Sequence, residues 1–309
     1  MKILLFAYHE IGCSALQTLY EMGEEVCAVF THEDDVKENV WFGSIKKYAE
    51  SLNIPCFTPE NPNTNEWIEK IKKMNPEIIF SFYYRRLLCD EILAIPAKGA
   101  LNLHGSLLPK FRGRAPVNWV LVKGEKETGI TLHYMTKKAD SGDIVAQKKF
   151  KIEKEDTAFL LYKKMVPLTR ELLLTTIPLL SEGKAPRIPQ DEKAATLFKG
   201  RKPEDGKIDW KNSAGENYNL IRAVTHPYPG AFMFLNNKKI FIWEAQEEKK
   251  GAYTKKNKKE GEIINRVPLL ISCGKGVLKV EKLQTEGEKE LSSLDWTNEN
   301  NIQIGTILE

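Results

Sequence analysis

The chain has 309 residues, of which 42% are hydrophobic and 28% are charged, and its formal net charge at pH 7 is +4. This length accommodates two domains of ordinary size, and the composition is typical of a globular protein rather than a disordered or fibrous one. The charge is too small to favour a dedicated nucleic-acid binder. Residues 205–309 agree with this, because they carry 16 Lys and Arg against 15 Asp and Glu.

The hydrophobic stretches are short, and the cysteines are scattered. The N-terminal run 2–7 is soon followed by His9 and Glu10, so it is not the apolar core of a signal peptide, and no stretch is long enough to span a membrane. The five cysteines have no CxxC spacing, which predicts neither a disulfide framework nor a zinc site. We therefore expect a cytoplasmic protein with reduced thiols and no membrane partner.

Strand-like and helix-like segments alternate in the first third of the chain. Such alternation predicts an α/β domain with a parallel sheet and helices on both faces. The expected strands are 2–6, 24–31, 77–84 and 99–105, and the expected helices are 11–23, 44–53 and 66–75.

The next segment adds a helix and a hairpin. Pro116 is a favourable first residue for a helix that continues to about 124. Two strands, 129–135 and 143–152, are joined by the turn "KKADSG". A long helix over 157–181 follows, with Pro167 inside it.

A change of composition near 181–206, with three prolines and many charges, indicates a linker. We place a catalytic domain at 1–185, the linker at 186–204 and a C-terminal domain at 205–309. The last domain has one expected helix and several short strands, a pattern typical of a small OB-like β-barrel. The Lys-rich stretch 249–259 is expected to be a solvated hairpin loop.

Two polar side chains stand out on the strand 99–105. Asn102 and His104 are two residues apart, so they point to the same face, and Gly105 begins a loop directly after them. Ligands of such sheets bind beyond the carboxyl ends of the strands. An amide beside an imidazole suits acyl transfer, where an oxyanion is stabilised and a proton moves. Spacing alone equally supports a purely structural role, with both side chains hydrogen-bonded at a strand end.

Other common kinds of site find no support. The five histidines have no spacing typical of metal ligands, so no metal is expected. The first strand is not followed by GxGxxG, and neither GxxxxGK[ST] nor GxSxG occurs. The sequence therefore predicts no dinucleotide site, no nucleoside-triphosphate site and no serine nucleophile.

Four motifs resemble the folate-dependent formyltransferases, a family that includes methionyl-tRNA and sugar-nucleotide formyltransferases. They are "NLHGSLLPKFRGRAP", "ETGITLHYMTKKADSGDIVAQ", "IDW" and "IRAVTHPYPGAF", and the resemblance covers nearly the whole chain. It implies a Rossmann-like domain that transfers a formyl group from 10-formyltetrahydrofolate without a metal.

Further segments resemble one branch, the formyltransferases of UDP-4-amino-4-deoxy-L-arabinose. These are "FAYHEIGC", "FTHEDD", "WFGSIKKYAESLNIPCFTPEN" and "RGRAPVNWVLVKGE". The branch implies formylation of the 4-amino group of that sugar for lipid A modification, which confers resistance to cationic peptides such as polymyxin. Another nucleotide-linked 4-amino sugar is the nearest alternative, initiator tRNA is less favoured, and a non-enzymatic binding module is least favoured.

The chain differs from well-known members of this branch in its length. They carry a C-terminal dehydrogenase/decarboxylase domain with its own GxGxxG, whereas this sequence ends at Glu309 without one. We therefore expect either a stand-alone formyltransferase or a separately produced fragment of a bifunctional enzyme.

The resemblance implies three catalytic residues, Asn102, His104 and Asp140. His104 would manage the proton of the attacking amine, and Asn102, together with His104, would stabilise the oxyanion. The carboxylate of Asp140 would orient His104 and raise its pKa by favouring the imidazolium.

The resemblance also implies binding residues. Arg114 would bind the acceptor, since an arginine suits a diphosphate or sugar hydroxyls. Tyr8, His9 and Trp119 are weaker candidates for the wall of the acceptor cleft. Arg86 stands where this branch often has His. The implied folate site comprises Arg86, Leu87, Leu88, Thr136, Lys137, Lys138, Ala139 and Asp140.

Overall fold

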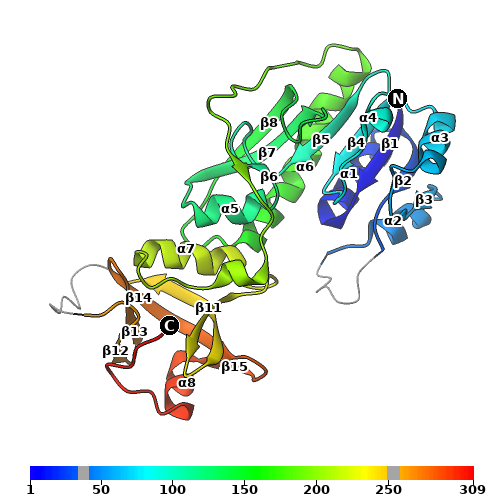
Figure 1. Cartoon of the computed structure of the whole chain (residues 1–309). Helices are drawn as coiled ribbons and strands as arrows, with labels where there is room; N and C mark the ends of the chain where they lie inside the picture. The colour runs from blue at the N-terminus through cyan, green and yellow to red at the C-terminus, as the bar shows by residue number, and fades with distance from the viewer. Residues whose placement is uncertain (34–41, 249–257) are drawn as a thin grey trace. The chain divides into compact units, whose positions relative to one another are not determined.

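The computed structural model describes residues 1–33, 42–248 and 258–309, which form two compact units (Figure 1). Most of the expected Lys-rich loop, residues 249–257, lies outside the described residues. Each unit is assembled from three stretches of the chain. Unit 1 consists of Met1–Pro116, Glu127–Lys151 and Tyr162–Lys199, and unit 2 consists of Val117–Lys126, Ile152–Leu161 and Gly200–Glu309.

Unit 1 is built on a seven-stranded sheet. Its spatial order is β3 (Cys56–Phe57), β2 (Glu25–Phe30), β1 (Lys2–Ala7), β4 (Ile78–Phe82), β5 (Ala100–His104), β7 (Glu127–Tyr134) and β8 (Ile144–Lys151). All pairings from β3 to β5 are parallel, whereas β7 is antiparallel to both β5 and β8.

The predicted α/β, Rossmann-like architecture is confirmed: the strands of the first third of the chain pair in parallel, and the two strands expected to be joined by the turn "KKADSG" form an antiparallel hairpin. β7 and β8 are joined only by residues 135–143, which are too few for the crossover that a parallel pair requires. The sheet is therefore mixed and mostly parallel, with a hairpin at one edge.

The parallel strands form the core of unit 1 because they are apolar at nearly every position. All of β4 is buried, as are residues 3–7 of β1, and such continuous apolar runs are typical of strands covered on both faces. On one face, Leu4 and Phe6 belong to a cluster with Ile71 of α3 (Asn65–Met74) and Ile92 of α4 (Asp90–Leu93).

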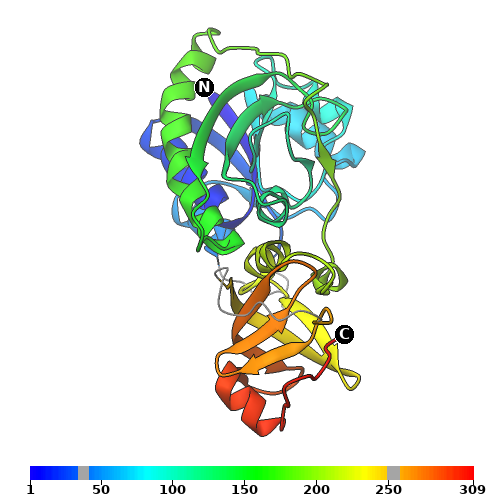
Figure 2. The same cartoon turned by 90° about the vertical axis from the view of Figure 1, so that its left-hand side faces the viewer.

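Two further helices are joined by hydrogen bonds in unit 1. The Ile11 amide lies in the first turn of α1 (His9–Glu21), where intrahelical acceptors are missing, and donates to the Tyr162 hydroxyl at 3.1 Å. Tyr162 belongs to α6 (Ala158–Ser181), which continues through Pro167 as one helix. Figures 1 and 2 show α6 lying along one side of the sheet. The shorter elements of unit 1 are α2 (Ile45–Ser51), β6 (Arg112–Gly113) and β9 (Leu197–Phe198), whereas α5 (Pro116–Val122) belongs to unit 2 from Val117 onward.

Unit 2 contains a six-stranded antiparallel sheet, which confirms the β-rich C-terminal domain. In spatial order the strands are β10 (Ala231–Leu235), β11 (Lys238–Glu247), β14 (Val277–Thr285), β13 (Leu269–Ser272) and β12 (Ile263–Arg266), and β15 (Glu290–Ser292) also pairs with β14.

Two helices of unit 2 begin at serine caps. Ser213 and Glu216 form a reciprocal capping box at the start of α7 (Ala214–Val224), and Ser292 caps α8 (Ser293–Glu299). The turn η1 (Pro203–Gly206) precedes them. Across the described ranges of both units, no helix is both long and apolar enough to cross a membrane.

The core of unit 2 depends on Trp296 of α8, whose side chain is fully buried. We expect Trp296→Ala to lower the free energy of unfolding of this unit by about 3–5 kcal/mol. Leu294 lies on the same helix but is 46% exposed, so Leu294→Ala serves as the control and should change it by no more than about 0.5 kcal/mol. Hydrogen exchange of the β13–β14 amides measures the effect, and equal losses in the two variants would contradict the assignment.

Candidate active site

The site is built where β5 and β7 lie side by side at the carboxyl end of β5. In their antiparallel register Asn102 is paired with His133, and His104 is paired with Thr131. His104 is buried and Asn102 is half-buried, and Leu101 and Leu103, which point to the opposite face, are both buried. The strand therefore presents its two polar side chains to one face, as its alternation predicts.

Asp140 reaches this face from the β7–β8 connection. Its Oδ1 atom lies 3.6 Å from Nδ1 of His104 and 3.5 Å from Nε2 of His133, and its Oδ2 atom accepts a hydrogen bond from the Gly113 amide at 2.8 Å. The structure thus brings Asn102, His104 and Asp140, the three predicted catalytic residues, into one cluster.

His133 is the member of this cluster that the sequence analysis missed. Its Nδ1 atom donates to the Tyr134 carbonyl at 2.9 Å, which leaves Nε2 as an acceptor for the amide of Asn102 at 3.1 Å. One N–H of Asn102 is thereby fixed in direction, while the other remains a donor. Only the register between β5 and β7 reveals this partner, since His133 and Asn102 are 31 residues apart in the chain.

The protonation of His104 follows from its own hydrogen bond. Nε2 lies 2.7 Å from the Phe111 carbonyl, which only accepts, so Nε2 carries the proton. The lone pair of the neutral ring is then on Nδ1, on the side of Asp140. A proton taken up at Nδ1 produces an imidazolium next to a carboxylate.

Burial and the surrounding charges and hydrogen bonds act in opposite directions on the pKa of each member of this pair. Burial lowers the pKa of His104. The charge of Asp140 and the hydrogen bond to the Phe111 carbonyl raise it, but their effect is smaller than that of burial. Asp140 raises the pKa of His104 as predicted, but burial has the larger effect and the net pKa is lowered. Burial raises the pKa of Asp140, but His104, His133 and the Gly113 amide together lower it to about 2. Near pH 7 the site holds a neutral imidazole beside an ionised carboxylate.

The loops around the cluster adopt backbone conformations that constrain their sequence. Asp140 has φ of 53°, the left-handed region that non-glycine residues rarely adopt. Gly113 has φ of 97°, and a Cβ atom there would lie 2.2 Å from the Phe198 carbonyl oxygen. Only glycine fits this position, and its amide is the one that binds Asp140.

The residues implied for folate binding follow β4 and β7, the two neighbours of β5. Leu87 is 72% exposed and Arg86 is exposed, whereas the Leu88 side chain is buried in the cluster around Leu4 and Ile92. In the second segment, Thr136, Lys137, Lys138 and Ala139 are all exposed. The two segments thus flank the strand that carries Asn102 and His104.

The basic loop after β5 contains arginines of two kinds. Arg114, the residue implied for acceptor binding, is exposed, and its guanidinium has no ion-pair partner within the described ranges. Arg112 is instead buried and bonded to Gln190 and Glu192. The sequence pattern does not distinguish them, because the partners of Arg112 come from a distant segment.

The weaker candidates lie in different units. Tyr8 and His9 follow β1 in unit 1, where burial, Arg85 and His32 lower the pKa of His9 to about 3. Trp119 lies in unit 2, and the Arg201 guanidinium is 4.7 Å from the centre of its ring. In the part of the chain that the structure describes, no group of three or more His, Cys, Asp or Glu residues has the arrangement of a metal site.

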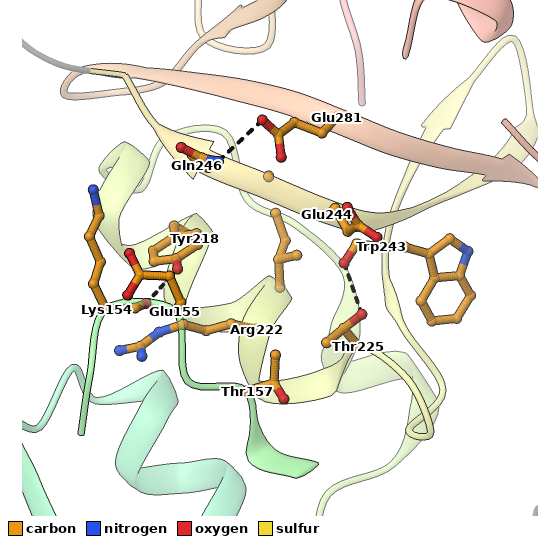
Figure 3. Close-up of a pocket in the computed structure, with 12 residues that line it drawn as sticks. Lys154, Glu155, Thr157, Tyr218, Arg222, Thr225, Trp243, Glu244, Gln246 and Glu281 are labelled. Carbon is orange, nitrogen blue, oxygen red and sulfur yellow. Dashed lines mark hydrogen bonds between the residues drawn. The ribbon is translucent and has the colours of Figure 1, made fainter. Parts of the chain in front are cut away.

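A separate hollow of about 240 Å³ lies in unit 2 (Figure 3). Tyr218 and Arg222 from α7 face Glu244 and Gln246 from β11 across it. Its remaining lining residues are Lys154, Glu155, Thr157, Ile221, Thr225, Trp243, Ala245 and Glu281. None of the predicted catalytic, folate-binding or acceptor-binding residues belongs to this set.

Comparison with solved structures identifies proteins of the same fold. An N-formyltransferase from Helicobacter canadensis, in complex with folinic acid and dTDP-3-aminofucose, is 21% identical with a TM-score of 0.70, and the match covers 92% of this chain and 99% of that one. WlaRD, a sugar 3N-formyl transferase in the presence of dTDP and 5-N-formyl-THF, is 21% identical with a TM-score of 0.68, and 94% and 99% of the two chains are covered.

HypX from Aquifex aeolicus, in complex with tetrahydrofolic acid, is a third match, with 17% identity and a TM-score of 0.64. The match covers 98% of this chain but 48% of HypX, so the chain spans about half the length of that protein. At these identities the likeness shows a common fold.

Family models match both parts of the sequence. The C-terminal domain model of the formyl transferases matches residues 201–301. The formyl transferase model itself matches residues 2–177, which are more than half of the chain and include the whole cluster around His104. The chain therefore belongs to the formyl transferase family.

Proposed function

We propose that this protein transfers a formyl group from 10-formyltetrahydrofolate to the 4-amino group of UDP-4-amino-4-deoxy-L-arabinose in the cytoplasm. The observation that carries the proposal is the cluster of Asn102, His104 and Asp140 within a chain of the formyl transferase family. A neutral buried base, an ionised carboxylate and an oriented amide are the groups that formyl transfer to an amine requires.

In the proposed reaction the amine nitrogen forms a bond to the formyl carbon, whose carbonyl oxygen becomes an oxyanion. The second N–H of Asn102 donates to this oxyanion. Nδ1 of His104 takes the proton that the attacking nitrogen loses, and the carboxylate of Asp140 stabilises the resulting imidazolium. The bond from the formyl carbon to the folate nitrogen then breaks, and that nitrogen takes up the proton from Nδ1 of His104, which returns the ring to its neutral form. The products are a formamide and tetrahydrofolate.

The folate supplies the activated formyl group, and the residues beside β5 suit such a molecule. Leu87 exposes 72% of a large apolar side chain next to Arg86, which fits a flat pterin ring, and residues 136–140 supply polar groups on the other side of β5. Arg114 is proposed to bind the acceptor diphosphate. The solved structures from Helicobacter canadensis and of WlaRD, which contain formyl-folates with dTDP or a dTDP-sugar, support a nucleotide-sugar acceptor.

Two alternatives differ only in the acceptor. Another nucleotide-linked amino sugar is favoured by the dTDP compounds in the similar structures. Initiator tRNA is disfavoured by the near-neutral C-terminal segment, since proteins that grip phosphates carry clustered cations. With the arabinose substrate, the product would serve lipid A modification and resistance to cationic peptides such as polymyxin.

An acceptor panel tests the proposal directly. The purified protein is incubated with 10-formyltetrahydrofolate and, separately, with UDP-, dTDP- and GDP-linked 4-amino sugars, a dTDP-linked 3-amino sugar and initiator tRNA. We expect the highest kcat/KM for UDP-4-amino-4-deoxy-L-arabinose. Turnover of tRNA alone, or of a dTDP-sugar alone, would refute this assignment of the acceptor.

Removal of the proposed base should abolish turnover without abolishing binding. We expect His104→Ala to lower kcat by about 10²–10⁴-fold, because the amine proton has no acceptor. Isothermal titration with 5-formyltetrahydrofolate should show a Kd close to that of the parent protein. His226→Ala is the matched control, since His226 is exposed in unit 2 and should leave kcat unchanged. Full activity of His104→Ala would remove His104 from the mechanism.

The pH profile should report the balance of burial and charge at His104. Burial lowers the pKa of His104, so the acidic limb of kcat/KM should lie below the ordinary value of 6.5 and activity should be level above it. Asp140 raises that pKa, so Asp140→Asn should move the limb to still lower pH while reducing the rate. Ionisation of the substrate amine is common to both proteins, so their difference reports the enzyme. A limb that moves upward would contradict this assignment.

A further inference from the structure

A segment that follows α6 forms hydrogen bonds to two loops of the site, the loop after β5 and the β7–β8 connection. This segment, residues 186–198, is called the strap below. Ile188 exchanges backbone hydrogen bonds with Ile144 at the start of β8, at 2.8 and 3.0 Å. At its other end, β9 pairs in parallel with β6 in the loop after β5. All of these residues belong to unit 1.

Gln190 lies in the strap between these two ends and bonds to both loops. Its Nε2 atom donates to the carbonyls of Asp140, at 2.9 Å, and Gly142, at 2.7 Å. Its Oε1 atom accepts from Nε of Arg112 at 3.1 Å and from Nη2 at 2.8 Å. Because carbonyls only accept and a guanidinium only donates, a single orientation of the amide satisfies all four bonds.

These four bonds complete a closed path around the catalytic carboxylate. Arg112 is 3% exposed and precedes Gly113, whose amide binds Oδ2 of Asp140. The amide of Gln190 thus binds the backbone of Asp140 directly and, through Arg112, the loop whose Gly113 amide binds its carboxylate.

The conformation of Asp140 makes such a restraint necessary. Its φ of 53° is unfavourable for a residue with a side chain, and a strained residue persists only where its surroundings determine it. The Gln190 bonds fall on Asp140 itself and on Gly142, two residues later. Without them the carboxylate can relax away from Nδ1 of His104.

We propose that Gln190 is a positioning residue, which sets the distance between the Asp140 carboxylate and His104. This proposal rests on the function proposed for the His104–Asp140 pair, and it assigns no substrate contact to Gln190. Displacement of the carboxylate removes the charge that raises the pKa of His104 and stabilises its protonated form.

The test uses the full chain with Gln190→Met, which keeps the length of the side chain and removes all four hydrogen bonds. Glu192→Gln is the control, because Glu192 also lies in the strap and bonds Arg112 and Lys138 but does not bond residues 140–142. Gln190→Glu is a second variant, which retains the acceptor for the buried guanidinium if Gln190→Met does not fold.

The first measurement needs no acceptor, so it is independent of the proposed substrate. NMR titration of the His104 ring should give a lower pKa in Gln190→Met than in the parent protein, shifted in the same direction as in Asp140→Asn. Glu192→Gln should titrate as the parent protein does. An unchanged His104 titration in Gln190→Met, beside a clear shift in Asp140→Asn, would overturn the proposal.

The second measurement is a double-mutant cycle on kcat with the best acceptor from the panel. Gln190→Met or Gln190→Glu should lower kcat by about 10- to 100-fold with a smaller change in KM for the folate. In the Asp140→Asn background the same substitution should have little further effect, because the group that it positions is gone. An equal loss in both backgrounds would show that Gln190 acts through another residue and would refute the proposal.

Discussion

The buried contact between His104 and Asp140 is the constraint on which the rest of the site depends. A carboxylate removed from water takes up a proton unless other groups compensate for the lost hydration. Here the positive charge of the protonated His104 ring and the hydrogen bond from the Gly113 amide both favour the carboxylate, and the pKa of Asp140 is lowered to about 2. The charge can exist at this place only because three separate segments of unit 1 meet there.

This requirement explains the mixed sheet. β4 is buried along its whole length, whereas β5 places Asn102 and His104 on one face, where they require polar partners. The antiparallel β7 brings His133 opposite Asn102 and returns through a short connection that carries Asp140. The direction of one strand thus delivers two of the four polar groups of the site.

The sequence predicts the individual strands, helices and turns well, because these depend on residues that are close together in the chain. The apolar runs of β1 and β4, the hairpin around Asp140 and the face shared by Asn102 and His104 all follow from periodicity and turn residues. The family resemblance adds Asp140 to the pair. The direction of β7 relative to β5 and the partner of Asn102 depend instead on pairing between distant segments, which periodicity does not specify.

The sign of the pKa shift at His104 has the same origin. A nearby carboxylate is visible in a motif, and it predicts an increase, but the degree of burial is a property of the whole unit and reverses the result. Arg112 and Arg114 give a second example. Both belong to one basic loop, yet Arg112 is buried by a partner 78 residues away, and Arg114 remains exposed.

The groups of the site also divide into buried ones and exposed ones. His104, Asp140 and Arg112 are held by buried bonds, so a substitution there disturbs several partners at once. Arg86, Leu87 and Arg114 are exposed, so a substitution at these positions disturbs the packing of the protein less than one in its interior. Under the proposed function, the groups that act on the formyl carbon lie in the interior of unit 1, whereas the residues proposed to bind the folate and the acceptor lie on exposed loops that the fold constrains less.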